Sequence, residues 1–311
     1  MSVMHQHRRN RILMGQDNNA LTWLIIINAV IFVLLNFIKI IYYLSFDSSQ
    51  LVATQNFHLQ ILDWFTLPAS LGKLATRPWT ILSYMFSQES VWQLIGTLLW
   101  LWAFGYIFQD LTGNSKLIPL YLYGGFAGAV FFVASANLLP ALSGNLAETA
   151  LIGGGASVMA VAVGTTTLSP GYRIFPMLSG GIPLWVLTLI FVAVDYATIG
   201  SVNGSFAIAH LAGAAIGFIF IKQMQRGKDW SVWMVDAYQW TDDLFNPEKK
   251  IERKTHKMQT FYKATRKPFE RKPKLTQEKL DELLDKINDK GYHSLSDDEK
   301  DLLKKASKED F

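Results

Sequence analysis

Two side chains in the apolar part of the chain could together carry out hydrolytic chemistry, Ser157 and His210. A serine hydroxyl is a weak nucleophile until a neighbouring base accepts its proton, and a neutral histidine can be that base. Each residue lies in an apolar segment with many small residues, and His210 is the only histidine inside such a segment. The pair predicts acyl-transfer chemistry if the fold brings both side chains to one water-accessible site.

The composition indicates a membrane-embedded body followed by a soluble tail. Of the 311 residues, 50% are hydrophobic, with 10 Trp and 20 Phe, which is more apolar surface than a soluble domain usually carries. Residues 226–311 hold 20 of the 29 Lys and Arg, whereas residues 21–221 hold eleven charged side chains of either sign. The chain has no cysteine, which excludes disulfides and thiolate metal sites. No metal or cofactor is expected.

Six apolar segments are predicted to cross the membrane as helices. The basic residues favour cytoplasmic termini, because three Arg precede the first segment and Lys222, Arg226 and Lys228 follow the last. The loop before the fourth segment then faces outward. Residues 44–79 are too polar to span and are predicted to form short interfacial pieces. The predicted spans are 21–43, 92–108, 117–139, 153–168, 184–199 and 206–221.

The part after the membrane body divides into a linker and a small helical module. The boundaries are residues 1–20 for the N-terminal tail, 21–225 for the membrane domain, 226–274 for the linker and 275–311 for the module. Residues 249–274 carry eleven Lys and Arg and are expected to lie on anionic lipid and not to bind nucleic acid. In the module, Gly291 is predicted to end a first helix, and Ser296 with Glu299 forms a capping box for a second. We expect this hairpin to dock a cytoplasmic partner.

Three sequence landmarks resemble the rhomboid family of intramembrane serine proteases, and the resemblance covers residues 21–225. The tail from Leu275 to Ala306 resembles the extension found on rhomboids of Bacteroidota-type bacteria. The resemblance implies an all-α, polytopic membrane protein with the six-transmembrane-helix rhomboid fold, followed here by a soluble helical hairpin. The landmarks are Thr76-Arg77-Pro78-Trp79-Thr80 with Tyr84-Met85-Phe86, Leu98-Leu99-Trp100-Leu101-Trp102 with Phe104-Gly105, and Ala209-His210-Leu211-Ala212-Gly213 with Gly217.

The resemblance also implies roles for single residues. The family uses a Ser–His dyad without an acid, so His210 is the general base and Ser157 the candidate nucleophile. The oxyanion donors of the family fall on Gln93 and Thr97, and an amide or hydroxyl at these positions can donate a hydrogen bond. Asp195 lies inside the fifth span, where an acid is a functional candidate, and it is expected to make a structural or gating hydrogen bond.

The family motif fits this chain in two registers, and they disagree about the nucleophile. Counting from Gly155, the motif places Met159 where a bulky residue packs on the histidine, and Gly155 itself then stands at the nucleophile position. Two positions on a helix differ by about 200° of rotation, so Gly155 and Ser157 cannot both face His210. Ser157 can serve only if the helix begins two residues later, with the glycines as an extended loop.

Two functions remain open from the sequence. The glycine at the nucleophile position, Gly155, and the changed oxyanion donors, Gln93 and Thr97, favour a rhomboid pseudoprotease that binds membrane helices. The alternative is an active serine protease with a Ser157/His210 dyad. In both cases the expected partners are single-span membrane proteins and membrane lipid. The expected location is the bacterial inner membrane.

Overall fold

The computed structural model describes residues 19–45, 50–174, 181–199, 204–234, 236–237, 240 and 277–306. The N-terminal arginines, Tyr238 and the basic linker 249–274 lie outside these residues. The chain divides into two compact units, Met1–Asp242 and Asp243–Phe311, and each is treated by itself.

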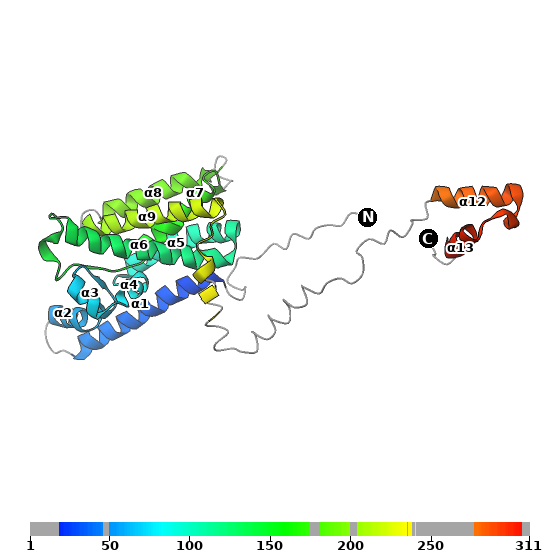
Figure 1. Ribbon diagram of the computed structural model, residues 1–311. Helices are drawn as coiled ribbons and strands as arrows, with labels where there is room; N and C mark the ends of the chain where they lie inside the picture. Colours follow the sequence, from blue (N-terminus) through cyan, green and yellow to red (C-terminus); the bar gives the residue numbers. More distant parts are fainter. Residues whose placement is uncertain are drawn as a thin grey trace. The chain divides into compact units, whose positions relative to one another are not determined.

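The described residues of the first unit form six apolar helices, as the hydropathy pattern predicts (Figure 1). Four of these helices are long and apolar enough to cross a membrane: α1, α5, α6 with the turn before it, and α9. The helices α7 and α8 are apolar but shorter. The prediction of a helical polytopic membrane protein is therefore confirmed. The bounds are α1 Ala20–Ser45, α5 Val91–Thr112, α6 Leu117–Leu138, α7 Gly155–Leu168, α8 Leu184–Ile199 and α9 Gly204–Gln225.

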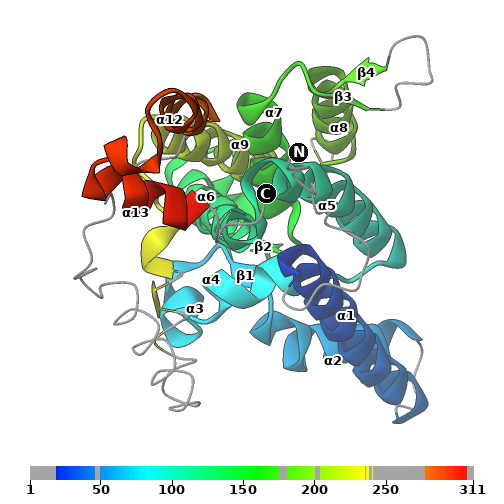
Figure 2. The same ribbon diagram turned by 90° about the vertical axis from the view of Figure 1, so that its right-hand side faces the viewer.

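Helix α7 is the centre of this bundle and contacts α5, α6, α8 and α9 (Figure 2). Its residues from Ala156 to Ala162 are all buried, because small side chains let the neighbouring helices come close. On α9, a methyl group built on Gly213 or Gly217 would lie under 3.0 Å from the backbone of α7. The close packing of α7 on α9 therefore depends on these two glycines.

Short elements between α1 and α5 support one end of the bundle. The strand β1 (Leu67–Pro68) pairs antiparallel with β2 (Ala150–Leu151), which directly precedes α7. Arg77 lies over the Trp64 ring at 4.5 Å, and Trp64 stacks on Trp79. The remaining elements here are α2 (Gln50–Gln60), η1 (Leu62–Trp64), α3 (Leu71–Thr76), α4 (Thr80–Ser83) and η2 (Tyr84–Phe86). Elsewhere lie η3 (Asn114–Lys116), η4 (Ser143–Asn145), β3 (Arg173–Ile174) and β4 (Ile182–Pro183).

The described part of the second unit is a helical hairpin with the predicted cap. Helix α12 (Gln277–Lys290) ends at Gly291, whose φ of 75° favours glycine, and η5 (Tyr292–Ser294) leads to α13 (Asp297–Ala306). The Ser296 amide donates to Glu299 Oε2 at 2.8 Å, while the Glu299 amide donates to the Ser296 hydroxyl at 3.3 Å. Leu283 and Leu295 are buried between the two helices. The predicted capping box and hairpin are confirmed.

Candidate functional site

The first turn of α7 is held in place by the segments before it. The Gly153 amide donates to the Tyr84 carbonyl at 2.9 Å, and Gly153 has a φ of 106°, a backbone conformation that other residues rarely adopt. A methyl group on Gly154 would lie 2.5 Å from the Tyr121 hydroxyl, which itself donates to the Met85 carbonyl. The strand pair and these contacts fix the chain direction, so that α7 begins at Gly155.

His210 of α9 and Asp195 of α8 form a hydrogen-bonded pair at this end of the bundle. The distance from His210 Nδ1 to Asp195 Oδ2 is 2.8 Å, and both side chains are largely buried. An acid inside an apolar helix is costly unless it finds a partner, and the imidazole N–H supplies one. The sequence predicts a structural or gating bond for Asp195, and His210 is its partner. Asp195 and His210 are both ionisable groups within apolar spans, and this shared property was a signal for pairing them.

Gly155 lies directly against the imidazole ring. A methyl group built on its α-carbon would lie under 3.0 Å from both Cε1 and Nε2 of His210 and 3.1 Å from Nδ1. The ring therefore occupies the space that a side chain at position 155 would need. In this arrangement the residue that faces the candidate base has no side chain to act as nucleophile.

Ser157 lies on another side of α7. Its hydroxyl is fully buried and has no hydrogen-bond partner among the described residues. A methyl group on Gly125 of α6 would lie 2.7 Å from Ser157 Oγ, and the Tyr121 hydroxyl of α6 is a polar neighbour of Ser157. Because α7 begins at Gly155, the delayed helix start that a Ser157/His210 dyad requires is not found. The structure does not bring Ser157 and His210 together.

The two predicted oxyanion donors lie near the ring, on α5. Gln93 and Thr97 both line the cavity that contains His210, and the Gln93 side-chain amide donates to the Ile152 carbonyl at 3.2 Å. Gln88, just before α5, is fully buried with no partner for its amide among the described residues. Met159 is buried in the core of the bundle. Its predicted packing on His210 stays a prediction.

A cavity of about 530 Å³ opens beside the histidine. It lies between α5, α8, α9 and the start of α7, and its walls are mostly apolar. Phe191 of α8 packs on Trp100 of α5 at 4.8 Å between ring centroids, which joins the two helices on either side of the cavity. The lining residues are Trp92, Gln93, Gly96, Thr97, Trp100, Leu151, Ile152, Gly155, Val158, Phe191, Val194, Asp195, Thr198, Phe206 and His210.

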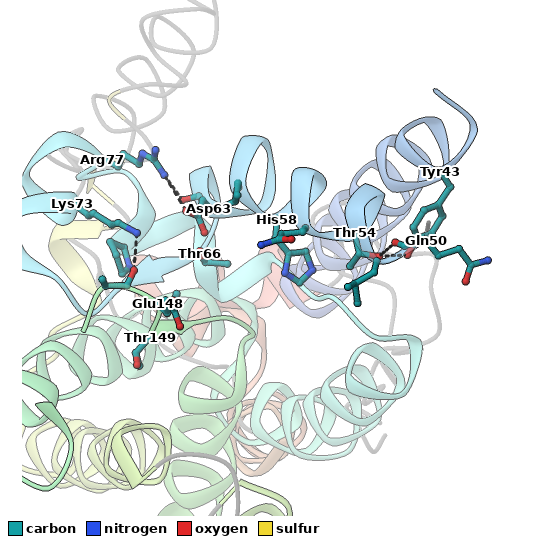
Figure 3. Close-up of a pocket in the computed structure, with 16 residues that line it drawn as sticks. Tyr43, Gln50, Thr54, His58, Asp63, Thr66, Lys73, Arg77, Glu148 and Thr149 are labelled. Carbon is teal, nitrogen blue, oxygen red and sulfur yellow. Dashed lines mark hydrogen bonds and ion pairs between the residues drawn. The ribbon is translucent and has the colours of Figure 1, made fainter. Parts of the chain in front are cut away.

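A second cavity, of about 760 Å³, lies between α2, α3 and the segment before β2 (Figure 3). Its charged side chains already have partners. Lys73 donates to the Ala147 carbonyl at 2.7 Å, Arg77 pairs with Asp63 at 3.9 Å, and His58 Nε2 lies 2.7 Å from Glu89. These ionic contacts stabilise the interfacial elements, and His58 provides a histidine in a different environment from that of His210.

The chemistry available at the first cavity follows from the Asp195–His210 pair. A carboxylate carries no proton to donate, so Nδ1 donates to Asp195, and in the neutral ring Nε2 presents its lone pair. The pair fixes the tautomer and orientation of the imidazole, as an acid does in hydrolase triads. The arrangement can accept a hydrogen bond or a proton at Nε2. Gly155, the residue that packs against the ring, offers it no side-chain nucleophile.

Two family models match this chain, one in the membrane body and one in the tail. The tail, at residues 269–309, matches a family of unknown function (DUF6576). A comparison with curated proteins finds no match. Residues 75–226, which include α5 to α9 and every residue of the His210 cavity, match the Rhomboid domain. Residues 75–226 of the membrane body are therefore a rhomboid domain.

Proposed function

We propose that this protein is a rhomboid pseudoprotease, which binds the membrane helices of single-span proteins without cleaving them. The observation that carries the proposal is the position of Gly155 against the ring of His210, where a nucleophile would be needed. The histidine base only removes a proton from a nucleophile, so without an adjacent hydroxyl no acyl-enzyme forms through this base. The buried Ser157, which faces α6, does not offer a substitute.

The cavity suits a helix or a locally unwound helical segment. Its walls are apolar and aromatic, with a few polar groups from Gln93, Thr97 and the Asp195–His210 pair. Polar groups of this kind can satisfy backbone N–H and C=O groups that leave a helix where it unwinds. Clients with helix-breaking residues in their membrane segment are therefore expected to bind most tightly.

Reconstituted vesicles test the proposal, with an active rhomboid protease as positive control in identical vesicles. A single-span reporter substrate carries a fluorophore pair, so that cleavage and binding are both measured. We expect the wild-type protein to bind the reporter and leave it intact, and a fluorophosphonate probe to leave Ser157 unlabelled, because an unactivated hydroxyl reacts slowly.

The alternative is an active serine protease that uses Ser157 and His210. Cleavage by the wild type that is lost in both Ser157→Ala and His210→Ala would refute the pseudoprotease and establish the dyad. Gln93→Leu serves as a further variant, because loss of an oxyanion donor lowers turnover by about two to three orders of magnitude in other serine proteases. In a pseudoprotease none of these substitutions changes a cleavage rate that is already zero.

The orientation and the tail complete the proposal. With both termini in the cytoplasm of a bacterial cell, the loop before α7 and the His210 cavity face outward from the inner membrane, as the Lys and Arg distribution favours. The hairpin α12–α13 then lies in the cytoplasm, where it docks a partner protein. Deletion from Pro273 onward tests this division, because the membrane domain should still insert and keep its melting temperature.

A further inference from the structure

His210 lines the cavity, and one of its ring nitrogens has no partner in the described part of the chain. Nδ1 is bonded to Asp195 at 2.8 Å, and Nε2 forms no hydrogen bond with any described residue. In the neutral ring, with its proton on Nδ1 towards Asp195, Nε2 is an acceptor. The cavity lies alongside, so water can bond Nε2 while no ligand is present.

We propose that the cavity selects membrane helices that carry a serine or threonine, whose hydroxyl donates a hydrogen bond to His210 Nε2. The inference rests on the proposed function, because it specifies which helices a non-proteolytic rhomboid binds. The client then supplies the hydroxyl that the chain lacks at Gly155.

Selection follows from what happens to water when a helix enters. The cavity walls contain Trp100, Phe191 and Phe206, so an apolar helix that fills the space displaces the water on Nε2 and leaves a buried acceptor unpaired. A hydroxyl on the helix replaces the lost bond. Leaving a buried acceptor unpaired typically weakens binding of the analogue without a donor by about ten- to a hundredfold.

A short donor fits better than a long one. Gly96 of α5 lines the cavity, and no atom lies within 4 Å of a methyl group built on it, whereas at Gly155 the His210 ring fills that space. Surfaces without side chains let a helix backbone come close, as in other glycine contacts between membrane helices. A hydroxyl attached at the β-carbon then reaches the ring, whereas a longer amide or indole would need additional space.

Asp195 is the positioning residue for this contact. Without the Asp195 carboxylate the ring can turn and can carry its proton on Nε2. The Nε2–H group would then face the client hydroxyl as a second donor and could not accept its hydrogen bond. The Asp195–His210 bond also joins α8 to α9 beside the cavity. It therefore fixes the position of the imidazole ring relative to both helices.

A set of synthetic membrane helices tests the proposal on the full-length protein in vesicles. Each probe is a Leu/Ala helix of about 22 residues with threonine or the isosteric valine at one position, moved along the outward half of the helix. Binding is measured by energy transfer to a label on the protein. We expect threonine to bind about ten- to a hundredfold more tightly than valine at one position or at positions one turn apart.

The histidine variants assign the preference to the ring. His210→Phe should bind the threonine and valine helices equally, while His58→Phe, which removes a histidine from the second cavity, should keep the preference. Asp195→Leu should reduce it. In wild-type protein with 15N-labelled histidine, the Nε2 resonance of His210 should shift with the threonine helix and not with the valine helix, a readout that does not depend on any variant folding.

The outcomes separate this inference from the proposed function. Tight binding of both helices with no threonine preference at any position overturns the hydroxyl selection and leaves the pseudoprotease intact. Cleavage of the probes, or binding of neither helix, refutes the pseudoprotease and the selection with it. A preference that persists in His210→Phe places the recognition elsewhere and also overturns the inference.

Discussion

Gly155→Ala should destabilise the membrane domain, although alanine is the better helix former. The added methyl group would lie under 3.0 Å from Cε1 and Nε2 of His210, whereas a normal carbon contact is about 3.5 Å. The ring must therefore withdraw by more than about 0.5 Å. Unless α8 moves as well, this displacement strains the hydrogen bond of 2.8 Å between His210 Nδ1 and Asp195 Oδ2.

The cost has two parts that can be estimated separately. A lost hydrogen bond to a charged group costs about 1.5–3 kcal/mol, and overpacking a buried site costs about 1–3 kcal/mol. The sum, reduced by the helix propensity of alanine, is about 2–5 kcal/mol. For a domain of this size we expect the melting temperature to fall by roughly 5–15 °C.

Thermal unfolding in detergent micelles, followed by circular dichroism, measures the effect. Gly96→Ala is the matched control, because its methyl group meets no atom within 4 Å and should leave the melting temperature unchanged or slightly raised. In an Asp195→Ala background the ring is free to turn, so Gly155→Ala should cost less by at least about 1 kcal/mol. Equal melting temperatures for Gly155→Ala and Gly96→Ala would refute the packing of the ring on Gly155.

Three further predictions concern other parts of the chain. Gly217→Ala should lower the melting temperature at least as much as Gly155→Ala, because its methyl group meets the α7 backbone under 3.0 Å, and a loss no larger than that of Gly96→Ala would contradict this. In the tail, the hydrogen bond from Lys286 lowers the pKa of Glu299 below its usual value, so ionised Glu299 stabilises the hairpin and this contribution disappears as the pH falls through that pKa. Circular dichroism of residues 269–309 should show helicity falling from about pH 6 to about pH 3, with a flatter profile for Glu299→Gln. Fusion reporters at Met1 and Phe311 should both report the cytoplasmic side, and two outward readings would reverse the topology.

The spans and the hairpin could be predicted because their signals are local. Apolar runs, the Gly291 stop and the Ser296–Glu299 cap each depend on a few neighbouring residues, and the structure has helices where these signals predict them. The boundaries moved by a few residues. Helix α5 continues to Thr112, beyond the predicted end at Phe108, since hydropathy ends at a polar residue while the helical backbone does not.

The choice between Gly155 and Ser157 could not be made from local signals. Both registers fit the sequence, and the deciding fact is where α7 begins, which depends on the contact of Gly153 with Tyr84 and on the pairing of β1 with β2. These contacts join segments far apart in the chain. In the same way, the pairing of Asp195 with His210 depends on how α8 and α9 are rotated about their axes, and the nearly uniform apolar sequence of α8 does not encode that rotation.

The absence of a side chain at Gly155 and the presence of Asp195 have a common physical consequence. A free dyad histidine bonds its serine through Nε2, whereas this ring is tied at Nδ1 and packed on a glycine. An acid in an apolar helix costs about 2.5–3.5 kcal/mol during membrane insertion, more than a single neutral contact between two helices usually returns. If Asp195 served only to hold α8 against α9, apolar side chains would do this without the free-energy cost of inserting an acid. The carboxylate is therefore best explained by what it does to the ring, which is to leave Nε2 as an oriented acceptor at the wall of the cavity.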